Sequence, residues 1–151
     1  MIMSDRFEDL REGFAFDVWA SRKWWDYLQA SSPSDASLAI FRHMLVAQEV
    51  WNQRVIGNSL VDWPKVEPSM ENLERLNQAW VEHLTHRQDD PIIHYHRFDR
   101  VAGHLHLSQI ARHILDHGTY HRGELRGLCR SRNVEDFPET GLALYWMTNG
   151  A

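Results

Sequence analysis

The sequence predicts an all-α protein, because apolar residues recur at helical spacing through most of the chain. Four segments carry this period, residues 4–30, 35–56, 69–86 and 109–130. A period of two interrupts the pattern just before the last of these segments. The chain has 151 residues, of which 43% are hydrophobic and 25% charged, and it is predicted to form one domain over residues 1–151.

The first two segments are predicted to be long helices that are separated at Pro33. Residues 4–30 have Ser4 as an N-cap candidate, and residues 35–56 end at Gly57, a residue suited to the turn that closes a helix. We expect the apolar face of each helix to lie in the core. These faces contain Phe7, Leu10, Phe14, Val18, Trp25 and Leu28 in the first helix, and Phe41, Met44, Leu45, Gln48, Trp51 and Val55 in the second.

A third helix and a short hairpin are predicted next. The loop 58–68 contains two prolines, and Ser69 is the N-cap candidate of a helix that reaches about residue 86. Residues 91–107 then alternate between two faces, and Gly103 lies within this stretch. This period of two predicts a short β-hairpin before the last long helix.

Residues 109–130 form the fourth predicted helix. Its apolar face contains Ile110, Ile114, Gly118, Leu125 and Leu128. The arginines on its other side are interpreted as a solvated face, and they are Arg112, Arg122, Arg126 and Arg130. Residues 133–151 are expected to return over the helices, with a helical turn at Leu142–Met147.

Charge and composition argue against several classes of protein. The formal net charge is −5, and no cluster of Lys and Arg is interleaved with aromatic residues, so we do not expect nucleic-acid binding. No secretory signal is visible, and the longest apolar run, Leu142–Met147, is too short to span a membrane. The single cysteine, Cys129, cannot form an internal disulfide, which favours a cytoplasmic location. Seven tryptophans favour a well-filled core, a subunit interface or an apolar pocket.

His117 and His121 are the first candidates for chemistry. On a helix, residues four apart have Cβ atoms roughly 5–6 Å apart, so both imidazoles can reach one cation at about 2.0–2.1 Å. Both histidines lie on the apolar face or at its edge, and they can equally be core histidines that hydrogen-bond to neighbouring helices. Gly118 stands where the zinc-protease motif has its Glu, which argues against peptide hydrolysis of that kind.

A metal site needs a third ligand, because two imidazoles hold a divalent cation weakly. His43 is the preferred candidate, at the flank of the apolar stripe of its helix, although by periodicity alone it is equally a boundary histidine. His113, one turn before His117, is an alternative third ligand. It can equally support a ligand histidine without binding the metal ion itself. A hairpin can bring together a second metal site, or its histidines can form a solvated face. The histidines in question are His94, His96, His104 and His106.

Two stretches of the chain resemble helical motifs of the DinB/YfiT-like superfamily. They are residues 43–51, HMLVAQEVW, followed by RVIG at 54–57, and residues 113–124, HILDHGTYHRGE. Residues 16–20, FDVWA, are similar to the first-helix pattern of that superfamily, and FPET at 137–140 to its tail. The resemblance covers nearly the whole chain, and the motif at 113–124 is its most specific part.

The resemblance implies a four-helix bundle, commonly a homodimer, in which three histidines hold one divalent metal ion. By position these ligands are His43, His117 and His121. The family usually has Gln where this chain has Glu124, and often Asp where it has Gly141. Glu124 can orient a ligand imidazole, act as an acid or base near the metal, or support the helix surface. The change at Gly141 concerns the packing of the tail and not the metal site.

Three neutral imidazoles leave a bound metal ion an open coordination position, which is typical of catalytic sites. Characterised relatives include enzymes that use low-molecular-weight thiols, so the resemblance implies a metal-dependent thiol transferase acting on a small-molecule substrate. One alternative is a hydrolase in which the metal activates water and Glu124 carries the proton. The other is a non-catalytic, dimeric, stress-related metal-binding protein. Imidazole ligation does not distinguish zinc, nickel or iron.

Overall fold

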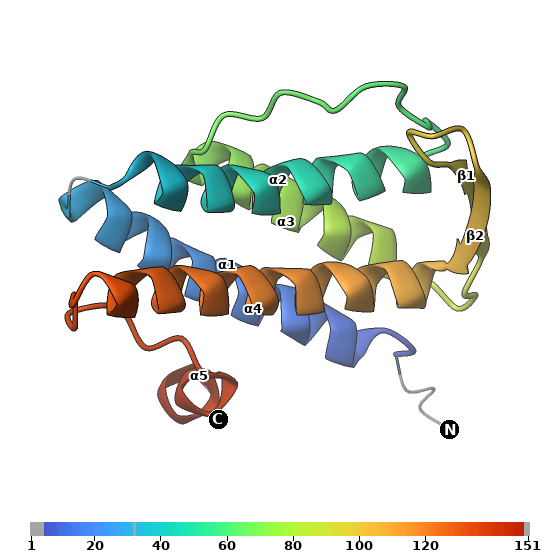
Figure 1. Ribbon diagram of the computed structural model, residues 1–151. Helices are drawn as coiled ribbons and strands as arrows, with labels where there is room; N and C mark the ends of the chain where they lie inside the picture. The colour runs from blue at the N-terminus through green and yellow to red at the C-terminus, as the bar shows by residue number, and fades with distance from the viewer. Residues whose placement is uncertain (1–4, 32, 150–151) are drawn as a thin grey trace.

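The computed structural model describes residues 5–31 and 33–149, and in that part of the chain four long helices and a short antiparallel hairpin form the fold (Figure 1). The long helices are α1 (Glu8–Ala30), α2 (Asp35–Val55), α3 (Met70–Leu84) and α4 (Leu107–Ser131). Strands β1 (Ile92–His96) and β2 (Ala102–His106) lie between α3 and α4, and α5 (Leu142–Asn149) is a short C-terminal helix. The predicted predominance of helix and the predicted hairpin are confirmed.

Capping groups begin α2 and α3, and a glycine closes α2, at the positions that the sequence predicted. Ser34 Oγ accepts a hydrogen bond from the backbone N–H of Ser37 at 3.1 Å, and Ser69 Oγ accepts one from Asn72 at 3.0 Å. These bonds satisfy backbone donors that the first turn of α2 and of α3 leaves free. Gly57 follows α2 with φ +97°, a conformation that glycine adopts without steric cost.

Three boundaries of the long helices differ from the predicted ones by more than one residue. Helix α1 begins at Glu8, and the predicted cap Ser4 lies outside the described residues. Helix α3 ends at Leu84, because the next residue, Thr85, is extended with ψ 137° and His86 follows with φ 55°. Helix α4 begins at Leu107, since the backbone N–H of that residue donates to Pro91 O at 2.9 Å and joins the helix directly to the hairpin.

The four long helices pack around two clusters of buried apolar side chains. Helices α1 and α2 each contact both α3 and α4. One cluster includes Trp24, Leu28, Phe41, Leu45, Leu73, Leu76 and Leu125, and the other includes Phe7, Phe14, Trp80, Leu84, Leu107, Ile110 and Ile114. Burying a side chain of this kind stabilises the fold by about 1.5–3 kcal/mol before the loss of conformational entropy is counted.

One polar side chain from each long helix meets in the interior, between the segments that form the two apolar clusters. Arg122 Nη1 donates to Asp17 Oδ1 at 2.6 Å, while Gln48 and Asn77 donate to Asp17 Oδ2 at 3.2 and 3.4 Å. Asp17 is 1% exposed and Arg122 4%. We call these four residues the polar layer. Because the layer is shielded from water, each charge in it depends on the other for compensation.

The interpretation of Arg122 as part of a solvated face is wrong, although Arg112 and Arg130 are exposed as expected. The helical period puts Arg122 one turn after Gly118 and one turn before Leu125, on the buried face of α4. Gly118 leaves the space that the Asp17 carboxylate occupies, so α1 brings a counter-ion to an arginine that could not otherwise be buried.

We expect Gly118→Ala to destabilise the protein by about 1–3 kcal/mol, as overpacked cores do. A Cβ at this position would lie 2.5 Å from Asp17 Oδ1 and 3.1 Å from Arg122 Nη1, so the buried ion pair would have to move. Gly123→Ala is the matched control, because a Cβ there meets nothing within 4 Å and the helix should gain up to about 1 kcal/mol. Denaturant unfolding of both variants checks this, and equal stabilities would contradict it.

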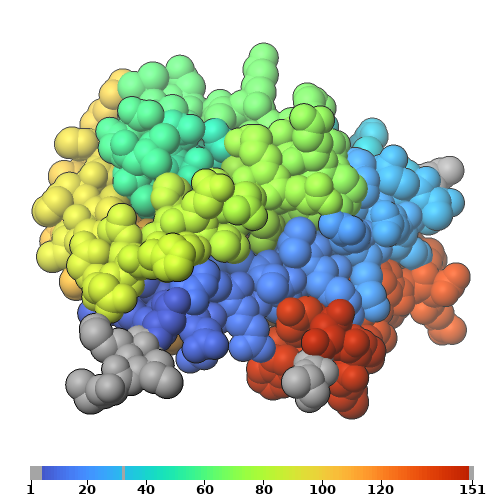
Figure 2. Space-filling view, turned by 180° about the vertical axis from the view of Figure 1, so that it is seen from behind, coloured from blue at the N-terminus to red at the C-terminus, as the bar shows by residue number. Residues whose placement is uncertain are grey.

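The described part of the C-terminal segment returns over the helices, as expected, and it lies against α1. Figure 2 shows the face on which α1 and α3 lie next to each other and the C-terminal residues lie against α1. Trp146 Nε1 donates to Glu12 Oε1 at 2.7 Å, and the ring of Tyr145 lies edge-on to Phe16 and Trp19. Within residues 5–31 and 33–149, no helix has the length and apolar character needed to cross a membrane.

Candidate metal centre

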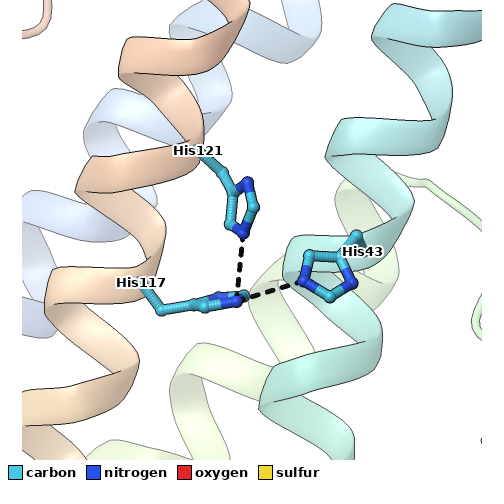
Figure 3. Close-up of side chains that lie close together, drawn as sticks. All are labelled: His43, His117 and His121. Atoms are coloured by element: carbon cyan, nitrogen blue, oxygen red, sulfur yellow. Dashed lines mark hydrogen bonds between the residues drawn. The ribbon is translucent and has the colours of Figure 1, made fainter.

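Three imidazoles from two helices face one another (Figure 3). His43 projects from α2, and His117 and His121 project from successive turns of α4. His117 Nε2 lies 3.2 Å from His43 Nε2 and 3.1 Å from His121 Nε2. Within the described ranges this is the only group of three or more His, Cys, Asp or Glu side chains whose ligand atoms lie within 4.8 Å of one another. We call it the histidine cluster.

The packing of α2 against α4 assembles the histidine cluster. Gly118 directly follows His117, and Arg122 directly follows His121. Both are buried, Arg122 as a member of the polar layer and Gly118 against Asp17 of that layer. This orientation of α4 leaves the two histidines half-buried at the side of the helix that faces α2. His43 lies 74 residues before His117 in the sequence and is exposed, so the cluster opens to solvent at α2.

The nitrogen spacing fits a divalent cation. Two nitrogens that are each about 2.0–2.1 Å from a tetrahedral ion lie roughly 3.3–3.4 Å apart, close to the two separations in the cluster. A neutral imidazole nitrogen carries either a hydrogen or a lone pair. His117 Nε2 therefore cannot serve as donor to one neighbour and acceptor from the other. A cation satisfies all three nitrogens at once, which hydrogen bonds among the neutral rings cannot do.

Glu124 contacts the ring nitrogen of His121 that points away from the cluster. His121 Nδ1 donates to Glu124 Oε1 at 3.0 Å, so the protonated nitrogen points at the carboxylate and Nε2 presents its lone pair to the cluster. Hydrogen bonds of this kind fix the tautomer and the orientation of metal-binding histidines. The contact fits the role of orienting a ligand imidazole that the sequence suggested for Glu124.

Burial keeps two rings of the cluster neutral. It lowers the pKa of His117 to about 4, with further lowering by the charges that His121, His43 and His113 would carry. Burial also lowers the pKa of His43, followed by the effect of His121, while Glu124 acts in the opposite direction. Both rings are therefore unprotonated at neutral pH. Their nitrogens remain available as ligands without competition from protons.

The other candidate histidines do not belong to the cluster. The ring centroid of His113 is 5.8 Å from that of His117 and 5.6 Å from that of Trp51, so His113 stands beside the cluster. In the hairpin, His94 pairs with His104, with ring centroids 5.8 Å apart, and all four hairpin histidines are exposed. No third ligand joins this pair among the residues that the structure describes. These positions fit the solvated-face interpretation.

A cavity of about 570 Å³ lies beside the cluster, and His43 and His117 form part of its wall. Pockets for small molecules commonly measure about 300–1,000 Å³. The remaining wall is largely aromatic, with Trp51 from α2, Trp63 from the loop after it, and Tyr95 and Phe98 from the hairpin region. Two arginines, Arg54 and Arg97, also line it. The histidine cluster therefore faces a space that can hold a small organic molecule.

Arg54 and Tyr95 were not predicted to line a cavity. A signal for Arg54 was present, because His43, Ala47, Val50 and Arg54 recur at the three- and four-residue spacing of one helical face. Tyr95 had no such signal, since only the packing of β1 against α2 brings it beside Trp51.

Comparisons of the chain with protein-family models, characterised proteins and solved structures found no match. The resemblance to the DinB/YfiT-like superfamily therefore stays a prediction that rests on the motif residues themselves.

Glu124→Ala is expected to weaken zinc binding by about 10–100-fold, because His121 would lose the acceptor that orients it. Glu124→Gln is the matched variant. Its amide oxygen can still accept from His121 Nδ1, so its affinity should stay within a few-fold of the wild type. Competition titrations against a chromogenic chelator measure both affinities. Equal weakening in the two variants would show that the charge of Glu124 matters rather than its hydrogen bond.

Proposed function

We propose that this chain is a divalent-metal-dependent enzyme of the DinB/YfiT type, a four-helix bundle that uses a low-molecular-weight thiol on a small organic substrate. The observation that carries the proposal is that two residues of the histidine cluster also line the cavity of about 570 Å³. A closed structural metal site has four protein ligands and no adjoining space for a substrate. Here three imidazoles converge and one side of the cluster meets a cavity.

His43, His117 and His121 would hold the ion through Nε2, and zinc, nickel and iron all accept such ligands. A divalent ion supplies a Lewis acid there, which lowers the pKa of a thiol or a water molecule that binds to it. Glu124 fixes the tautomer of His121, and the aromatic wall of the cavity excludes water from a bound apolar substrate.

Two considerations favour a thiol over water as the nucleophile. The superfamily that the motifs resemble includes enzymes that use thiols. The hydrolase alternative needs Glu124 to carry a proton, yet this carboxylate bonds Nδ1 of His121, on the opposite side of the ring from the cluster. A homodimer and a cytoplasmic location are proposed on the same resemblance and on the single cysteine of the sequence.

The test measures transfer to an electrophile by zinc-loaded protein. Cysteine or glutathione is supplied with 1-chloro-2,4-dinitrobenzene, and p-nitrophenyl acetate without thiol serves as the hydrolysis substrate. We expect thiol-dependent product above the uncatalysed rate, lost in His117→Ala. Ester turnover that needs no thiol would support the hydrolase instead. Tight zinc binding with neither activity would leave a non-catalytic metal-binding protein.

A further inference from the structure

Arg54 is a buried cation for which the described residues provide no counter-ion. Its residue is only 8% exposed, and its guanidinium carbon lies 4.4 Å from the ring centre of Trp51, 4.9 Å from that of Tyr95 and 5.7 Å from that of Phe98. In the described parts of the chain, no hydrogen bond or ion pair includes the side chain of Arg54, whereas its backbone carbonyl accepts from the N–H of Gly57 at 3.2 Å. Aromatic faces attract a guanidinium, but they do not accept its N–H donors in the plane of the group.

Two other arginines, Arg122 and Arg97, do have counter-ions. Arg122, buried to a similar degree, is paired with Asp17 at 2.6 Å. Arg97 lines the same cavity as Arg54, and it is paired with Asp99 at 2.8 Å. Among the described residues, a carboxylate pairs with Arg122 and another with Arg97, whereas none pairs with Arg54. Burial lowers the pKa of Arg54, and an anion that entered the cavity would offset this desolvation by pairing with the guanidinium.

We infer that Arg54 binds the carboxylate of the substrate, and that the cavity takes a monoanionic organic acid with a flat apolar body. This inference rests on the proposed function for the role of the histidine cluster, but the binding site itself does not. A guanidinium offers a planar fork that matches a carboxylate. One unpaired cation matches one negative charge.

The layout of α2 orients such a molecule. His43 and Arg54 stand about three helical turns apart on the same helix, and both line the cavity. An acid with its carboxylate at Arg54 extends its body along the aromatic wall toward His43 and His117. Trp63 and Phe98, with ring centroids 4.4 Å apart, add further apolar surface to that wall. The uncharged end of the molecule then lies nearest the histidine cluster, where the proposed reaction takes place.

The probe is trans-cinnamate, with cinnamamide as its neutral isostere, and binding to zinc-loaded protein is followed by tryptophan fluorescence or calorimetry. We expect cinnamate to bind at least 10-fold more tightly than cinnamamide. Arg54→Met should weaken cinnamate by at least 10-fold and leave cinnamamide unchanged, and Arg54→Lys should fall between Arg54→Met and the wild type. Arg22→Met is the control, because Arg22 is not among the residues that line the cavity and its charge is paired with Glu74, and the affinity of this variant for cinnamate should stay within about threefold of the wild type.

His117→Ala separates this inference from the proposed function. If cinnamate binds the metal ion directly, its affinity falls in His117→Ala and not in Arg54→Met, and the inference is overturned. Equal affinities of cinnamate and cinnamamide for the wild type would overturn it without any variant. Arg54-dependent binding in a protein that takes up no metal would support the inference while refuting the proposed metal enzyme.

Discussion

Asp17→Ala is expected to cost about 3–5 kcal/mol of unfolding free energy, because it leaves Arg122 buried with no counter-ion. Gln48 and Asn77 would also lose the acceptor of their hydrogen bonds. Chemical denaturation measures the loss directly. For a protein of this size, about 1 kcal/mol corresponds to roughly 2–4 °C in Tm, so the variant should melt about 6–20 °C below the wild type.

The chain offers a matched control for this prediction. Arg22 and Glu74 also join α1 to another long helix, with the same 2.6 Å separation, but their side chains are 53% and 56% exposed. We expect Glu74→Ala to cost less than about 1 kcal/mol. The double variant Asp17→Leu, Arg122→Leu should recover only part of the loss, since Gln48 and Asn77 remain without their acceptor. Losses of similar size in Asp17→Ala and Glu74→Ala would refute the role assigned to the polar layer.

Zinc is expected to raise the thermal stability of the metal-free protein. At a free zinc concentration of about 100 times Kd, binding to the native state adds about 2.7 kcal/mol, or roughly 5–10 °C in Tm. The increase should disappear in His117→Ala, since this residue stands 3.2 and 3.1 Å from the other two ligand nitrogens. His113→Ala is the control one turn earlier on α4, and it should keep the increase. Loss of the increase in His113→Ala alone would place the ion elsewhere.

Most of the fold was predictable because it follows from local rules. The apolar period located α1 to α4, Ser69 located the start of α3, and alternation around Gly103 located the hairpin. The i and i+4 spacing of His117 and His121 likewise follows from helix geometry alone. These features need only residues that lie within a few positions of one another.

The features that were not predictable depend on residues far apart in the sequence. Periodicity did not decide whether His43 is a metal ligand or a boundary residue of its helix. Its place in the cluster follows from the packing of α2 on α4. Arg122 was grouped with the other arginines on the solvated face of its helix, although the helical period puts it beside Gly118 and Leu125, and its burial needs a counter-ion that periodicity does not identify. Its partner, Asp17, lies 105 residues earlier on α1. The aromatic surroundings of Arg54 likewise depend on the contact of α2 with the hairpin.

The metal content of the protein tests the central claim most directly. The protein should be purified without a histidine tag and subjected to elemental analysis beside the double variant His117→Ala, His121→Ala. We predict close to one equivalent of a divalent transition metal per chain in the wild type, and its loss in the variant. A wild-type protein that holds no metal even after reconstitution would contradict the account and leave the three histidines without a metal to bind.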